Sequence, residues 1–74
     1  MKAKEIQEGL LKGTQYENEA SGWYTLSRPK ENFFVIQFEE IYKKGQLVQK
    51  EEMKFYKNID SYSKRIAKLI RTGE

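Results

Sequence analysis

Residues 33–56, FFVIQFEEIYKKGQLVQKEEMKFY, contain two stretches of strand-forming residues on either side of the dipeptide Lys44-Gly45. An X-Gly pair between two such stretches is typical of a two-residue β-hairpin turn, because the turn requires positive φ angles that glycine adopts without strain. Folding about this turn pairs Lys43 with Gln46, and each later pair follows in the same register. We therefore predict a long hairpin with strands over about 33–43 and 46–57.

The register of this hairpin decides which side chains reach the core. It places Glu39 opposite Lys50, and opposite charges in facing positions stabilise a strand pair. A shift of one residue would turn each side chain of one strand to the other face. The face expected to enter the core carries Phe34, Ile36, Phe38, Met53 and Phe55. The more polar face is expected to carry Phe33, Val35, Lys54 and Tyr56.

Residues 22–28, GWYTLSR, are expected to form a third antiparallel strand before the hairpin. Pro29 favours a turn directly after this strand, because its ring fixes φ near the value that a turn needs. A five-residue loop would place Tyr24 and Leu26 in the core and Trp23 on the more polar face. A four-residue loop would bury Trp23 and expose Leu26 instead. We favour the five-residue loop and keep the four-residue loop as the alternative.

The two ends of the chain show the three-and-four spacing of apolar residues that is typical of amphipathic helices. Residues 2–12 form a short pattern and residues 60–72 a longer one. Asn58 or Asp60 can cap the start of the second helix, and Gly73 can mark its end. The apolar stripe of this helix consists of Ile59, Tyr62, Ile66, Leu69 and Ile70.

Together these elements indicate an α+β fold that forms a single small domain over residues 1–74. A short N-terminal helix precedes a three-stranded antiparallel sheet, and the C-terminal helix packs on one face of that sheet. The polar stretch 14–21 is expected to be a loop between the first helix and the sheet. A chain of this length buries only about 60% of the surface of its unfolded form, so its stability is expected to depend on close packing.

The composition excludes several classes of function. The chain has neither Cys nor His, which removes the thiol nucleophile, the commonest general base and most ligands of transition metals. No glycine-rich phosphate-binding loop is present. We therefore expect a protein without catalytic residues, cofactor or metal. No apolar stretch approaches the roughly 20 residues of a membrane span, so we expect a cytoplasmic protein without a membrane partner.

The charge is unevenly distributed along the chain. Residues 1–40 have a net charge of −2, from five cationic and seven acidic residues, whereas residues 41–74 have +5, from nine cationic and four acidic residues. A basic surface attracts an acidic partner. In the favoured registers, the more polar sheet face and its turn combine aromatic and cationic side chains, a combination that stacks on bases and neutralises phosphates. The residues of this candidate binding site are Trp23, Arg28, Lys30, Phe33, Lys54, Tyr56 and Lys57.

Two further arrangements remain open. The first helix can pack on this sheet face, in which case Trp23, Phe33 and Tyr56 would form a second small core instead of a binding site. The C-terminal helix also has a basic side opposite its apolar stripe, which is either a second phosphate-binding surface or an ordinary solvated face. The residues of this basic side are Lys64, Arg65, Lys68 and Arg71.

The expected order of three antiparallel strands and a following helix, over roughly residues 22–72, resembles the arm-type DNA-binding domain of tyrosine recombinases. In that family the strands enter the major groove of DNA and the helix packs behind them. The resemblance concerns the order of the elements and includes no residue motif. It implies a fold and, by analogy alone, binding to DNA.

Two functions follow as hypotheses. The first is a small, non-enzymatic nucleic-acid-binding accessory protein of a mobile element or phage, which binds through the aromatic and basic sheet face and its turn. The alternative is a compact inhibitor or adaptor that binds a protein partner through the same aromatic cluster. Either protein would act as a monomer, or as a homodimer formed through an edge strand or the exposed face.

Overall fold

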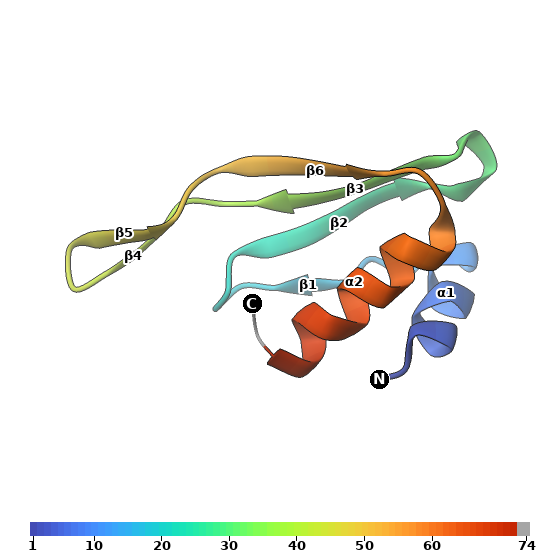
Figure 1. Cartoon of the computed structure of the whole chain (residues 1–74), viewed down its shortest axis with the longest axis horizontal. Coiled ribbons are helices and arrows are strands. Elements are labelled where there is room, and N and C mark those ends of the chain that lie inside the picture. Colours follow the sequence, from blue (N-terminus) through green and yellow to red (C-terminus); the bar gives the residue numbers. More distant parts are fainter. Residues whose placement is uncertain (73–74) are drawn as a thin grey trace.

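The structure is a computed structural model and describes residues 1–72. It has two layers, a β-sheet and two helices that lie together on one of its faces (Figure 1). In chain order the elements are α1 (Ala3–Leu11), β1 (Glu17–Asn18), β2 (Trp23–Arg28), the 3₁₀ helix η1 (Pro29–Glu31), β3 (Phe33–Phe38), β4 (Ile41–Lys43), β5 (Gln46–Gln49), β6 (Glu52–Tyr56) and α2 (Ile59–Thr72). The predicted α+β architecture, with a helix before and a helix after the strands, is confirmed.

The main sheet has four strands instead of the predicted three, in the antiparallel order β1-β2-β3-β6. The additional strand, β1, comes from the polar segment for which the sequence predicts a loop. Two hydrogen bonds hold this segment at the sheet edge: the Thr25 N–H donates to the Tyr16 carbonyl oxygen at 2.9 Å, and the Tyr16 N–H donates to Thr25 Oγ1 at 3.0 Å. Backbone pairing does not require apolar side chains, so the polar composition of the segment conceals its strand.

The hairpin predicted around Lys44-Gly45 forms, and it divides into two parts. Lys44 and Gly45 have φ angles of 53° and 78°, as a two-residue hairpin turn requires, and Lys43 pairs with Gln46 as predicted. β4 and β5 make a separate two-stranded sheet, which projects beyond the end of the main sheet (Figure 1). We call residues 41–49 the arm.

A β-bulge in the arm shifts the register of the rest of the hairpin. Tyr42 pairs with Leu47, but Ile41 pairs with Gln49, so Val48 is an extra residue on β5. A bulge adds one residue to one strand, and every pair beyond it moves by one position. The predicted register is therefore wrong beyond the arm. The observed β3–β6 pairs are Phe34 with Tyr56, Val35 with Phe55, Ile36 with Lys54, Gln37 with Met53 and Phe38 with Glu52.

The shift places each β6 side chain on the sheet face opposite to the predicted one. Lys54 lies on the face that the helices cover, which we call the inner face, because it pairs with the buried Ile36. Phe55 lies on the opposite, outer face. The predicted pair of Glu39 and Lys50 is not among the strand pairs of residues 1–72. By alternation, Glu52 and Tyr56 share the inner face with Lys54, and Met53 shares the outer face with Phe55.

The connection between β2 and β3 also differs from the favoured one. Arg28 pairs with Phe33, so η1 and Asn32 form a four-residue connection. Asn32 has a left-handed φ of 53°, which asparagine tolerates better than most residues. The favoured five-residue loop is therefore wrong, and the four-residue alternative is correct. As that alternative requires, only 2% of the Trp23 surface is exposed, whereas Leu26 is 40% exposed.

The core lies between the inner face and the two helices. Asn58 caps α2, because its Oδ1 accepts a hydrogen bond from the Ser61 N–H at 2.9 Å. The predicted apolar stripe of α2 is buried or half-buried, as expected, and the predicted end at Gly73 lies outside the described residues. α1 packs beside α2 and contributes Ile6 and Leu10. The other buried core residues are Trp23, Phe34, Ile36, Phe38, Tyr62, Ile66, Ala67 and Leu69.

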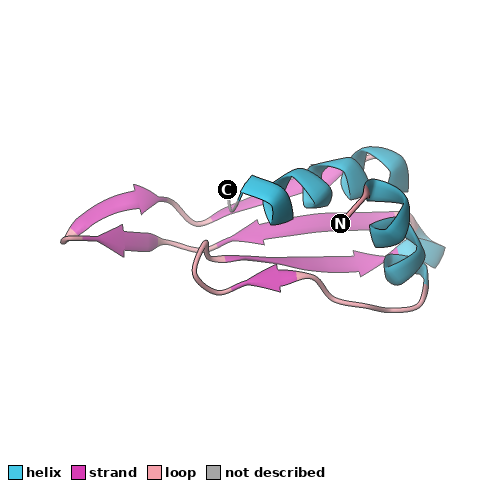
Figure 2. Ribbon diagram, turned by 90° about the horizontal axis from the view of Figure 1, so that it is seen from below, coloured by secondary structure: helices cyan, strands magenta, loops and turns pink. Residues whose placement is uncertain are grey.

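The outer face of the main sheet is not covered by either helix (Figure 1, Figure 2). Leu26, Val35 and Phe55 form a row across β2, β3 and the edge strand β6, because each pairs with the next. Phe55, Met53, Leu26 and Phe33 are exposed to 67%, 49%, 40% and 39%. Strand pairing assigns to the outer face Glu17, Tyr24, Leu26, Arg28, Phe33, Val35, Gln37, Met53 and Phe55. Tyr24 and Leu26, predicted to enter the core, therefore lie on this face instead.

Candidate functional site: a basic cleft between the arm and α2

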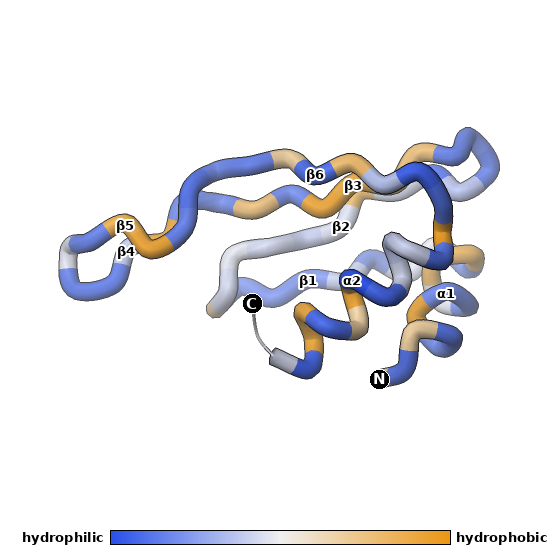
Figure 3. Tube along the Cα trace, viewed as in Figure 1, coloured by the Kyte–Doolittle hydropathy of each residue, from blue (hydrophilic) through white to orange (hydrophobic). Residues whose placement is uncertain are grey.

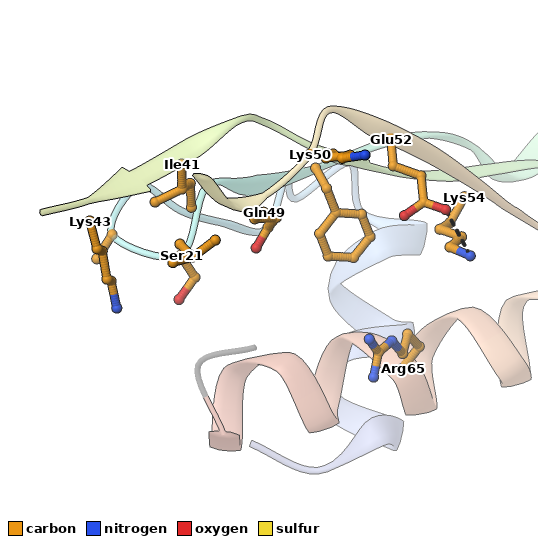
Figure 4. A pocket seen from close by; sticks show the side chains of 11 residues that line it. Ser21, Ile41, Lys43, Gln49, Lys50, Glu52, Lys54 and Arg65 are labelled. Carbon is orange, nitrogen blue, oxygen red and sulfur yellow. Dashed lines mark ion pairs between the residues drawn. The ribbon is translucent and has the colours of Figure 1, made fainter. Parts of the chain in front are cut away.

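A hollow of about 360 Å³ opens between the base of the arm, the end of β6 nearest the arm, and α2. Four of its lining residues are cationic: Lys43, Lys50, Lys54 and Arg65. Among the described residues that line it, Glu52 is the single acidic one. We call this hollow the basic cleft. Figure 4 shows its walls, with the arm and β6 on one side and Arg65 of α2 on the other.

Each cation of the basic cleft comes from a different part of the fold. Lys43 is the last residue of β4, Lys50 lies in the link between β5 and β6, Lys54 is in β6 and Arg65 is in α2. The bulge in the arm is essential to this arrangement, because without the shift in register Lys54 would lie on the outer face. The cleft therefore depends on the tertiary fold, and it is not a run of basic residues in the sequence.

The charge of the basic cleft is only weakly compensated from within. Lys54 Nζ lies 3.0 Å from Glu52 Oε1, and both side chains are about half exposed, at 54% and 55%. Ion pairs as exposed as this contribute only about 0.2–1 kcal/mol to stability, so Lys54 can exchange its partner at little cost. With four cations and one carboxylate, the lining residues have a net charge of +3. Such a concentration of charge in a hollow attracts a polyanion.

The base of the arm is attached to the main sheet at Gly22. The carbonyl oxygen of Gly22 accepts a hydrogen bond from the Glu39 N–H at 2.7 Å and another from Gln49 Nε2 at 3.4 Å. Gly22 has a φ of +70°, and a Cβ atom there would lie 2.6 Å from Ile41 Cγ1. The base of the arm therefore packs directly against the backbone of Gly22.

The arm combines exposed apolar residues with a basic turn. Tyr42 is 60% exposed and Val48 is 56% exposed, and the cationic residues Lys43 and Lys44 precede Gly45 at the turn. Figure 3 shows the hydrophobic part of β5 directly beside the hydrophilic turn. Val48 and Lys43 also line the basic cleft, so the arm and the cleft form one continuous surface.

The sequence-predicted aromatic face does not form, because its members lie on different faces. Trp23 is buried in the same core cluster as Ile6 of α1 and Tyr62 of α2, so it belongs to the main core and not to the separate second core that the open alternative describes. Tyr56 is half-buried on the inner face, where its ring centroid lies 5.5 Å from that of Tyr62. Phe33 lies on the outer face, in an edge-to-face contact with Phe55 at 6.4 Å between centroids.

The predicted cations of the β2–β3 turn lie at the opposite end of the sheet from the arm (Figure 1). Arg28 Nη1 is 3.6 Å from Glu31 Oε2, in an exposed ion pair. Arg28 and Lys30 line a separate hollow together with Leu11 of α1. Lys57 is exposed in the short link between β6 and α2. Of the predicted sheet-face site, only Lys54 therefore lines the basic cleft.

The basic side of α2 is also divided. Arg65 is half-buried and lines the cleft. Lys64, Lys68 and Arg71 are exposed and do not line it. Two cations of the cleft, Lys43 and Lys50, are missing from the sequence-based site. The clustering of lysines around the Lys44-Gly45 turn was the available signal for Lys43, and nothing local distinguishes Lys50.

No family model matches the chain, and no curated protein and no solved structure is significantly similar to it. Within residues 1–72, neither helix has the length and apolar character needed to cross a bilayer. The same residues contain no group of three acidic side chains placed to hold a metal ion. The arguments for function therefore come from the surfaces of the chain itself.

Proposed function

We propose that the protein binds nucleic acid, with a stretch of the phosphate backbone in the basic cleft. The observation that carries this proposal is the convergence of Lys43, Lys50, Lys54 and Arg65 on one hollow, with one carboxylate among its described lining residues. Lysine and arginine supply most contacts to phosphate, and neutralising the backbone is the main source of affinity for nucleic acids. Binding of this kind needs no catalytic residue, so the proposed role is that of an accessory module and not of an enzyme.

The shape of the arm and the residues at its tip favour duplex DNA as the ligand. A two-stranded β-ribbon fits the major groove of B-DNA, which is about 12 Å wide. Lys44 and Gln46 lie at the exposed tip of the arm, and both residue types can donate hydrogen bonds to base edges. Because Lys43 belongs to both the arm and the cleft, a duplex can place its groove at the arm and its backbone at the cleft.

The salt dependence of binding tests this proposal. Four phosphate contacts predict that the logarithm of the association constant falls with the logarithm of salt concentration with a slope of roughly −3 to −4 on duplex DNA. The measurement is fluorescence anisotropy of a labelled duplex at several salt concentrations. Arg65→Gln and Lys54→Gln should each reduce the steepness by about 1.

Lys64→Gln provides a matched control, because Lys64 is the neighbour of Arg65 in α2 but does not line the cleft. It should leave the slope nearly unchanged. Absence of binding at low salt would refute nucleic-acid binding altogether. An equal effect of Lys64→Gln and Arg65→Gln would refute the cleft as its site.

The second candidate is a protein-binding inhibitor or adaptor, and the outer face is the observation that favours it. Phe55 and Phe33 present exposed aromatic rings in mutual contact there, and aromatic side chains are frequent anchors of protein interfaces. The two candidates use opposite faces of the sheet, so they can be separated. Phe55→Ser would abolish binding of a protein target and preserve binding to DNA, whereas Arg65→Gln would weaken binding to DNA, with a shallower salt dependence, and preserve binding of the protein target.

A further inference from the structure

We propose that the outer face is an interface between two copies of this chain. Its apolar residues are contiguous: Leu26, Val35 and Phe55 pair in a row, and Phe33 touches Phe55. Val35 is fully buried by its neighbours, whereas Phe55 is 67% exposed. Exposed apolar patches of this kind commonly mark interaction sites, because covering them removes apolar surface from water.

The distribution of charge on the outer face indicates a second copy as the occupant. Arg28 lies at one end of the face, opposite Phe33 in the strand pair, and its exposed ion pair with Glu31 at 3.6 Å is weak enough to be exchanged for a carboxylate of another copy. Glu17 lies at the other end, opposite Tyr24. The apolar row lies between these ends, so the face has a cationic end, an apolar centre and an anionic end. A surface with this pattern is complementary to itself when one copy is reversed.

The symmetry of the pair follows from these charges. When the two sheets pack face to face about a two-fold axis perpendicular to the strands, the strands of one copy run opposite to those of the other. Arg28 of each copy then lies beside Tyr24 and Glu17 of the other copy. A two-fold axis along the strands would instead bring the two Arg28 side chains together. Opposite charges favour the first arrangement. In it, Leu26 faces Leu26 of the second copy, as in an aligned sandwich of two sheets.

The size of the face sets the strength of the interaction. With strands about 4.8 Å apart and a rise of about 3.3 Å per residue, three strands over five residues have a flat footprint of about 240 Å². The accessible surface buried by both copies should therefore lie below the standard interface of about 1,600 Å². We expect reversible association that depends on concentration. The basic cleft lies on the helix side of the sheet, so it stays open in the dimer and dimerisation does not require nucleic-acid binding.

Sedimentation equilibrium from about 10 µM to about 1 mM protein tests the interface, because this range brackets the affinities expected for so small a surface. The weight-average mass should rise from the 8.8 kDa of one chain toward twice that value. Phe55→Lys should keep the mass at that of one chain over the whole range. Leu47→Lys is the matched control, since Leu47 is 38% exposed on the arm and lies outside the outer face. Circular dichroism of each variant establishes that it is folded.

Reversal of the charges tests the orientation of the two copies. Arg28→Glu and Glu17→Lys should each weaken the dimer about tenfold, because each replaces two attractive contacts with two repulsive ones. The double variant should restore wild-type association. A single-chain mass at every concentration, or a dimer that persists in Phe55→Lys, would overturn the interface. Failure of the double variant to recover would overturn the proposed orientation.

Discussion

The Tyr62 hydroxyl donates a hydrogen bond of 2.6 Å to the carbonyl oxygen of Val35. Both residues are fully buried, at 0% exposure. The bond joins the first turn of the C-terminal helix to the backbone of the central strand β3, so it fixes how this end of α2 lies over the sheet. Burial raises the pKa of Tyr62 to about 12, and its hydrogen bonds to Thr25, Ser27 and Val35 oppose that rise only in part.

Removing this hydroxyl should destabilise the fold. Tyr62→Phe leaves the Val35 carbonyl oxygen buried without its side-chain donor, and the cost is expected to be about 1–3 kcal/mol. Urea unfolding followed by circular dichroism measures the free energy of unfolding. Tyr42→Phe is the control, because Tyr42 is 60% exposed, and it should change stability by less than about 0.5 kcal/mol. Equal stability of Tyr62→Phe and the wild type would contradict the assigned role of the bond.

The same residue should make the fold sensitive to alkaline pH. The unfolded chain loses the Tyr62 proton near pH 10, whereas the folded chain keeps it until about pH 12. Between these values the unfolded state binds fewer protons than the folded state, so stability falls as pH rises. The contribution of Tyr62 is fully present below pH 10, and its loss amounts to about 2–3 kcal/mol by pH 12. Urea unfolding at a series of pH values measures the free energy of unfolding as a function of pH. By pH 12, Tyr62→Phe should have lost about 2–3 kcal/mol less of this free energy than the wild type.

Trp23 should behave as a core residue in solution. Its side chain is 2% exposed among apolar neighbours, so its fluorescence should be blue-shifted and resist quenching by acrylamide. Urea-unfolded protein provides the reference for full quenching. Efficient quenching in the folded state would place Trp23 on the surface and would restore the five-residue β2–β3 loop.

Gly22 should be intolerant of a side chain. Gly22→Ala introduces a Cβ atom against Ile41 at a φ of +70°, and such strain costs roughly 1–3 kcal/mol. Part of the cost should be relieved in the double variant Gly22→Ala/Ile41→Ala, because the clash is removed while the backbone strain stays. A double-mutant cycle on the free energy of unfolding measures this coupling. Strict additivity of the two substitutions would show that the close approach is not what limits residue 22.

Local features of this fold are predictable because each depends on a few neighbouring residues. Lys44-Gly45 specifies its own turn, Asn58 caps the helix that follows it, and the stripe through Tyr62, Ile66 and Leu69 follows from helical spacing. In each case the chemistry that produces the structure lies within one or two turns of chain. These predictions are confirmed for that reason.

The assignment of faces is less predictable, because it depends on counting residues between distant elements. Val48 has no property that marks it as a bulge, yet its insertion moves Lys54 from the outer to the inner face. The β2–β3 connection likewise differs by one residue between its two alternatives, and that difference decides whether Trp23 is buried. Lys54 and Arg65 meet at one cleft only after both the register and the packing of α2 are known.

The bulge at Val48 also has an evolutionary consequence. Substituting this residue changes one side chain, whereas deleting it would favour the continuous register and present Met53 and Phe55 where Lys54 now lies. The surface of β6 is thus encoded by the number of residues in the arm more than by their identity. Relatives of this chain should therefore conserve the length of the segment between Tyr42 and Glu52 more strictly than its composition.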